Sequence, residues 1–243
     1  MRSGNPALTS KTFEGLARGE QSMTLQGTVN KTALLLGLVF LAALWTWDRF
    51  FLYQDPKAVL PLIAIGGIGG FVMALLTIFI KKIAAYTSPI YAVLEGVAIG
   101  GISAFYEAQF PGIVIQAVGL TFGTLACLLL AYRSGLIRPS ENFKLGVVAA
   151  TGAIALLYVV NMVMGFFGHS IGFIHDSGPI GIGFSVVVVA VAALNLVLDF
   201  DFIEEGVAKG APKYMEWYGA FGLLVTLVWL YLELLRLLSK MRR

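Results

Sequence analysis

The chain has 243 residues, of which 58% are hydrophobic and only 13% are charged, and its formal net charge is +3. Soluble globular domains usually contain about 25% charged residues, so this composition excludes an ordinary soluble protein. The small excess of lysine and arginine is typical of the inside-facing loops of membrane proteins and gives no signature of nucleic-acid binding. We therefore expect an integral membrane protein that contacts the lipid bilayer over most of its length.

Residues 1–28 form a polar segment that is rich in serine, threonine and glycine. It has neither the apolar core nor the small-residue cleavage pattern of a secretory signal. We interpret it as an N-terminal tail that its own basic residues and Lys31 hold on the cytoplasmic side. Residues 29–243 are then expected to form one transmembrane domain.

Seven apolar segments follow the tail, each close to the length of about 20 residues that a helix needs to cross a bilayer. They cover approximately residues 32–53, 60–80, 87–106, 113–132, 145–167, 180–198 and 219–238. The glycine pairs at 66–67 and 69–70 lack the preceding strand and the Lys-Ser/Thr ending of a phosphate loop, so we assign them to close helix packing. The prediction is an all-α membrane protein with seven transmembrane helices.

The basic residues give two conflicting signals about topology. The loop from Arg133 to Lys144 is strongly basic, which is typical of an inside-facing loop. Seven crossings from an inside N-terminus, however, place the basic end of the chain, with Arg236 and Lys240, outside. Either the last segment is not a full crossing, or the earlier charges dominate the orientation.

Glu95 lies well inside the third apolar segment, about 12 Å from its start at a rise of about 1.5 Å per residue. Tyr91 and Tyr106 lie on the same helix face. An ionisable group inside a membrane span is costly and is a functional candidate by default. Two interpretations stay open: Glu95 is a functional acid, or it is a protonated side chain that holds helices together by hydrogen bonding.

The sixth segment carries two polar stripes. Asn195 and Asp199 lie one turn apart on the first stripe. If the helix continues, Asp201 lies about 200° around it from Asp199, at roughly 100° per residue. Asp201, Glu204 and Glu205 form the second stripe, which we expect to be a solvated acidic surface at the end of a helix.

The seventh segment places Thr226 and Glu233 on one face, two turns apart, and Glu233 stands at ion-pair spacing from Arg236. An ion pair near the membrane interface is one interpretation of Glu233. The other makes it a carboxylate that acts together with the sixth segment.

These residues together resemble the Bax inhibitor family, in particular its bacterial Bax inhibitor/YccA-like branch. The resemblance covers nearly all of the chain after the tail. It is carried by the order and spacing of Glu95-Gly96 with Gly100 and Ser103, the Gly112–Val114 and Gln116-Ala117 segments, Leu198-Asp199, and the ending Leu230–Leu238.

The resemblance implies a seven-helix fold in which six helices surround a central C-terminal helix, and a proton-sensitive calcium leak across the membrane. It also implies that a hydrogen-bonded pair of aspartates, one ending the sixth helix and one inside the seventh, acts as pH sensor and gate. Asp199, which follows Leu198, matches the first aspartate. Thr226 occupies the position of the second, ten residues before Arg236.

The threonine changes the chemistry of this pair. Two carboxyl groups in contact share a proton, because both cannot ionise cheaply. Thr226 can hydrogen-bond to Asp199 but adds no like charge, so the pH switch is expected to be weakened, moved or absent. Glu233 is the alternative second carboxylate if the last helix is shifted.

The leading hypothesis is a multi-pass protein of the bacterial inner membrane that forms a pH-sensitive leak for calcium or another cation. Asp199 acts as gate or ion ligand, Thr226 and Asn195 as its hydrogen-bond partners, and Glu95 as a second acidic element of the pathway. Calcium takes about six to eight oxygen ligands. Because Asp199 has too few neighbouring oxygens for a tight site, we expect transient binding of calcium and no cofactor.

The second hypothesis is a membrane regulator that transports nothing and binds a membrane protease or another membrane protein. The absence of the second aspartate favours it. An enzyme is not expected, because Glu95, Asp199 and Glu233 have no nucleophile or histidine nearby in the sequence.

Overall fold

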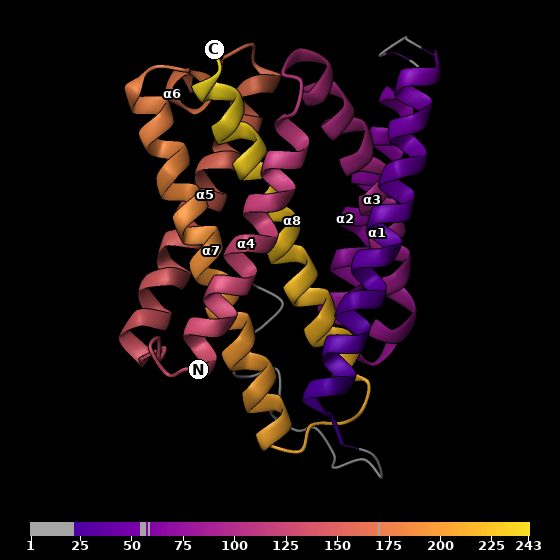
Figure 1. The fold of residues 1–243 in the computed structure, drawn as a ribbon, viewed down its shortest axis with the longest axis vertical. Coiled ribbons are helices and arrows are strands. Elements are labelled where there is room, and N and C mark those ends of the chain that lie inside the picture. The colour runs from indigo at the N-terminus through magenta and orange to yellow at the C-terminus, as the bar shows by residue number, and fades with distance from the viewer. Residues whose placement is uncertain (1–21, 54–56, 58, 170) are drawn as a thin grey trace. The chain divides into compact units, whose positions relative to one another are not determined.

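The computed structural model describes residues 22–53, 57, 59–169 and 171–243, and over these residues it is helical (Figure 1). Seven of its helices are long and apolar enough to cross a membrane. The described residues contain no strand, and their isolated β-bridge joins Ser22 to Pro212. The all-α membrane fold expected from the sequence is therefore confirmed.

The seven long helices are α1 (Leu25–Tyr53), α2 (Leu60–Phe79), α3 (Ala84–Gln109), α4 (Ile113–Arg133), α5 (Glu141–Phe166), α7 (Pro179–Ala208) and α8 (Met215–Met241). Two short elements accompany them, the 3-10 helix η3 (Lys81–Ile83) and α6 (Gly172–His175). Most bounds lie within a few residues of the apolar segments, because the length of an apolar run sets the length of the spanning helix.

The structure differs from the sequence prediction at two helix ends. Helix α1 begins at Leu25, inside the segment expected to be a polar tail, and α7 continues to Ala208, ten residues beyond the expected end of the sixth crossing. Gly210, with a φ of +63°, then closes the end of α7 in the left-handed conformation that favours glycine. Asp199 and Asp201 therefore lie on one continuous helix.

The described chain divides into two compact units. Unit 1 comprises Ile115–Phe202 and Val225–Arg243, and unit 2 comprises the described residues up to Val114 together with Ile203–Leu224. Unit 1 contains an apolar cluster formed by Ile154 of α5 with Val188 and Val191 of α7, against which Trp229 of α8 packs.

Unit 2 is built on close contacts of α3 with α1 and α2. A Cβ atom at Gly66 of α2 would lie 2.6 Å from the Leu94 carbonyl oxygen, and one at Gly96 of α3 would lie 2.5 Å from the Val39 carbonyl oxygen. Real side chains do not approach this closely, so both positions require glycine. Gly66 and Gly96 therefore serve helix packing and bring backbone to backbone, whereas a Cβ atom at Gly67 would meet nothing within 4 Å.

Helix α8 is the most buried of the seven spans. Of its apolar window, 67% is buried, compared with 11% for α5. Most of α8 therefore contacts protein rather than lipid, as the resemblance implies for the last helix.

Candidate functional site

The carboxylate of Asp199 is completely buried in α7, with 0% of the residue exposed. One turn before it, Asn195 is also buried, and its Nδ2 atom donates hydrogen bonds to Thr151 Oγ1 of α5 at 2.8 Å and to the Val191 carbonyl oxygen at 2.8 Å. These bonds fix the orientation of the amide. The stripe predicted from the sequence is therefore an internal polar face of unit 1.

Lys240 sets the register between α7 and α8 in unit 1. Its buried Nζ atom donates hydrogen bonds to the Gly181 carbonyl oxygen at 3.0 Å and to Ser185 Oγ at 2.9 Å. Asp199 lies fourteen residues after Ser185, and Thr226 lies fourteen residues before Lys240. Because fourteen residues make four turns in each antiparallel helix, this register brings Thr226 to about the level of Asp199.

The basic end of α8 also bears on the topology conflict. Lys240 bonds within unit 1, Arg236 pairs with Glu233, and Arg242 donates a hydrogen bond to Gln116 at 2.9 Å. These residues serve internal contacts, so their number is a poor guide to which side of the membrane the end occupies.

Glu233 takes part in an ion pair inside unit 1. Its side chain is only 3% exposed, and both of its oxygens lie 2.9 Å from Nη1 of Arg236. The Tyr158 hydroxyl of α5 donates a hydrogen bond to Glu233 at 3.0 Å and accepts one from Arg236 at 2.5 Å. The geometry favours the ion-pair interpretation of Glu233. Arg236 neutralises the negative charge that Glu233 would need in order to act as a second gate carboxylate.

The second acidic stripe is not uniformly solvated. Asp201 lies 2.6 Å from Nζ of the buried Lys144 on α5, and only 24% of its side chain is exposed. Glu205 forms an ion pair with Lys209, while Glu204 is exposed. Within this stripe Glu204 is thus exposed, whereas Asp201 links α7 to α5, a contact that the sequence did not predict.

Glu95 belongs to unit 2, where it is half-buried on α3. Among the described residues, none donates a hydrogen bond to its carboxylate and none forms an ion pair with it. A Cβ atom at Gly70 of α2 would lie 3.0 Å from its Oε2 atom and 3.9 Å from the Tyr91 ring. The absence of a side chain at Gly70 thus gives the carboxylate room against α2.

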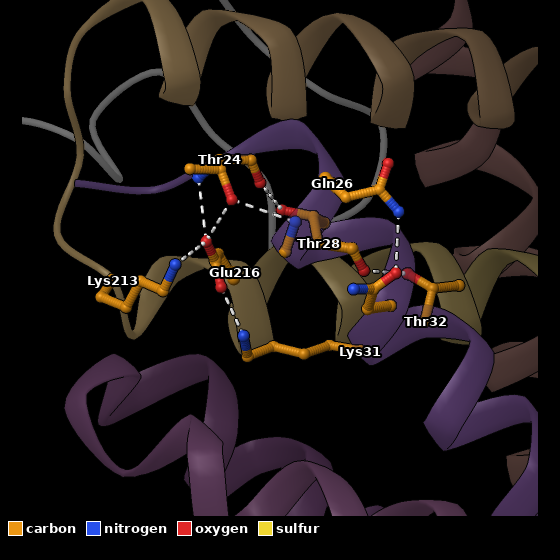
Figure 2. Close-up of polar contacts among 9 residues, drawn as sticks. Thr24, Gln26, Thr28, Lys31, Thr32, Lys213 and Glu216 are labelled. Carbon is orange, nitrogen blue, oxygen red and sulfur yellow. Dashed lines mark hydrogen bonds and ion pairs between the residues drawn. The ribbon is translucent and has the colours of Figure 1, made fainter. Parts of the chain in front are cut away.

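A further buried carboxylate, Glu216, escaped the sequence prediction. Figure 2 shows that Lys31 and Lys213 reach it from different directions, Lys213 at 2.9 Å. The backbone amide and hydroxyl of Thr24 donate to the same Oε1 atom at 2.9 and 2.8 Å. Glu216 therefore ties the start of α1 to the start of α8 within unit 2.

The sequence indicates only part of this cluster of Glu216 with Thr24, Lys31 and Lys213. Lys213 and Glu216 stand three residues apart at the start of a helix, a spacing that favours an ion pair, and an acidic residue in a first helical turn is favourable. Thr24 and Lys31 lie about 190 positions away, and no local pattern indicates that contact.

Comparison with known proteins supports the resemblance drawn from the sequence. The family model described as "Bax inhibitor 1 like" matches residues 5–243. No curated protein matches the chain. The match spans both units and all seven apolar helices. The chain is therefore a multi-pass membrane protein that belongs to the Bax inhibitor family.

Proposed function

We propose that this chain forms a pH-sensitive leak pathway for calcium or another cation, with Asp199 as its gate. The observation that carries the proposal is the complete burial of Asp199 on the polar stripe of α7. A carboxyl group enclosed in a membrane span is expensive to ionise. Its protonation state therefore decides whether the interior of unit 1 offers a negative charge to a cation.

The neighbouring groups suit a hard cation. Nδ2 of Asn195 is held by Thr151 and Val191, while its Oδ1 atom accepts no hydrogen bond from any described residue. The register of α7 and α8 supports a Thr226 hydroxyl at about the same level. Calcium takes about six to eight oxygen ligands, and these three side chains supply fewer. Such a site suits transient binding of a passing ion better than tight binding.

Calcium flux into liposomes at two pH values tests the proposal. We expect the parent protein to pass more calcium at the higher pH, where Asp199 is ionised, and Asp199→Asn to abolish this difference. The matched control is Glu204→Gln, which removes an exposed carboxylate from the same helix and should leave the flux at its parent value. Equal flux from the parent and Asp199→Asn at both pH values would overturn the proposal.

A second candidate is a regulator that binds a membrane protease or another membrane protein. Thr226 favours it, because a pair of one carboxyl and one hydroxyl does not share a proton as two carboxyls do. Under this candidate the parent protein passes no calcium at either pH, while pull-down of a membrane partner succeeds. In both candidates we place the chain in a bacterial inner membrane with a cytoplasmic N-terminus.

A further inference from the structure

Three other glutamates in or at the ends of the spanning helices have donors around them. Glu107 accepts hydrogen bonds from the Gly112 and Val114 backbone amides at 2.6 and 3.1 Å. Glu216 has its lysines and Thr24, and Glu233 has Arg236 and Tyr158. Glu95 has no hydrogen bond or ion pair with the described residues. Its charge therefore has no counterpart among the described residues of unit 2.

The helices packed around Glu95 supply no cation at its level. Helix α2 carries no titratable residue, and Gly96, the neighbour of Glu95, packs against Val39 of α1. The nearest charged residues of α1 are Lys31, eight positions before Val39, and Asp48 with Arg49 beyond it, each about 12 Å or more along the helix. Lys31 is already paired with Glu216.

Two phenols belong to the aromatic cluster that begins at Tyr91. Tyr91 lies one turn before Glu95 on α3, and its ring packs edge-on against Phe221 of α8 at 5.0 Å between centroids. Tyr218 of α8 lies 6.4 Å from Phe221, ring to ring, with Nζ of Lys81 6.0 Å from its own ring centroid. Neither phenol bonds to the Glu95 carboxylate. An ionised carboxylate in such surroundings is poorly solvated, which costs free energy. Binding of a proton neutralises the charge and removes this cost.

We propose that Glu95 is a proton-binding site in unit 2, a carboxylic acid held neutral between α2 and α3 in the room left by Gly70. The proposal is independent of the leak and of Asp199. It holds whether or not the chain conducts ions, because it concerns only the state of one carboxyl group in its own unit.

A protonated carboxyl in an apolar setting has a distinctive reaction with a membrane-soluble carbodiimide. The acid O–H adds across one C=N bond of the reagent: the proton goes to nitrogen, and the carboxyl oxygen bonds to the central carbon. The acyl group then migrates to nitrogen and leaves a stable N-acylurea, with no atom lost. A carboxylate that is held by an ion pair, as in Glu216 and Glu233, or by backbone N–H donors, as in Glu107, lacks the proton that this addition requires.

The experiment treats the full chain in phospholipid vesicles with dicyclohexylcarbodiimide and maps the modified peptides by mass spectrometry. We expect modification at Glu95 that declines as the pH rises, with Glu107, Glu216 and Glu233 unmodified. Glu95→Gln should lose the label, and Glu95→Asp should keep it. An unmodified Glu95, or labelling of Glu95 that does not change with pH, would overturn the proposal. This measurement needs only the parent protein, so it does not depend on whether the variants fold.

Two glycines of α2 provide a matched test of whether the Glu95 carboxyl group lies against α2. A Cβ atom at Gly70 would press on the Glu95 carboxylate, whereas one at Gly67 meets nothing within 4 Å. We expect Gly70→Ala to slow labelling by about fivefold, as overpacking of a close contact does, and Gly67→Ala to leave the rate unchanged. Equal rates in the two variants would contradict a site against α2.

Discussion

Glu233 in unit 1 and Glu95 in unit 2 are glutamates within membrane spans that have opposite surroundings. Glu233 is enclosed by an arginine and a tyrosine that both bond to it. Glu95 faces a glycine and an aromatic ring and accepts no hydrogen bond from the described residues. Residue type and depth therefore do not decide what an embedded carboxylate does, because the donors within reach decide whether it is a structural ion or a proton site.

The contrast between Glu233 and Glu95 predicts that substitution of Arg236 lowers the stability of the protein most. Replacing Arg236 by alanine leaves the buried Glu233 without its ion-pair partner, and breaking a buried pair on one side costs about 3–5 kcal/mol. Because the arginine side chain is 33% exposed, we expect the unfolding free energy to fall by about 3 kcal/mol, the lower end of this range. Thermal unfolding in detergent measures it.

A second substitution separates the lost pair from the stranded charge. Glu233→Gln in the Arg236→Ala background removes the uncompensated carboxylate, so most of the lost stability should return. If the double variant is as unstable as Arg236→Ala alone, then the arginine contributes by packing rather than by neutralising Glu233.

An intermediate effect is expected at Glu216, the other carboxylate with a full set of donors. Glu216→Ala leaves the Thr24 amide and the Lys31 ammonium without their acceptor, at a cost of about 2 kcal/mol. Hydrogen exchange should accelerate at the start of α1. Lys213→Ala, whose side chain is 45% exposed, is the control and should change the stability by less than about 1 kcal/mol. Unchanged exchange in Glu216→Ala would show that the start of α1 is held by other contacts.

The smallest effect is expected at Glu95. Glutamine has the shape of a protonated glutamic acid, so Glu95→Gln should change the unfolding free energy by no more than about 0.5 kcal/mol. The same thermal measurement checks it. A loss comparable to that of Arg236→Ala would mean that Glu95 is a structural ion after all, and the contrast between the two glutamates would disappear.

The fold was largely predictable from the sequence, because the thickness of the bilayer sets the length of every spanning helix. The bounds of α2 and α4 agree with their apolar segments within one residue. The end of α7 was predicted less well, because its last ten residues contain four carboxylates and the apolar run that marks the crossing stops before them. The short helix α6 lies in a glycine-rich stretch that carries no helical periodicity.

The partners of the site residues were less predictable. Arg236 with Glu233 follows from helical spacing, and the structure contains that pair. Tyr158 lies 75 positions from Glu233, and Lys144 lies far from Asp201 in the chain. These contacts depend on how the helices pack, which a single sequence does not specify. The roles of Asp199, Thr226 and Asn195 stay predictions.

The contact between Thr24 and Glu216 also has a consequence for synthesis of the protein. The two residues are 192 positions apart, so at about 5–20 residues per second roughly 10–40 s pass between their appearance at the ribosome. During that interval Lys31 has no Glu216 to pair with and remains a hydrated positive charge, the kind that directs helix orientation during insertion. The positive charge of Lys31 is thus available to orient the first helix and is later neutralised by Glu216 of the last helix. The contacts that hold the start of α1 therefore form only near the end of translation.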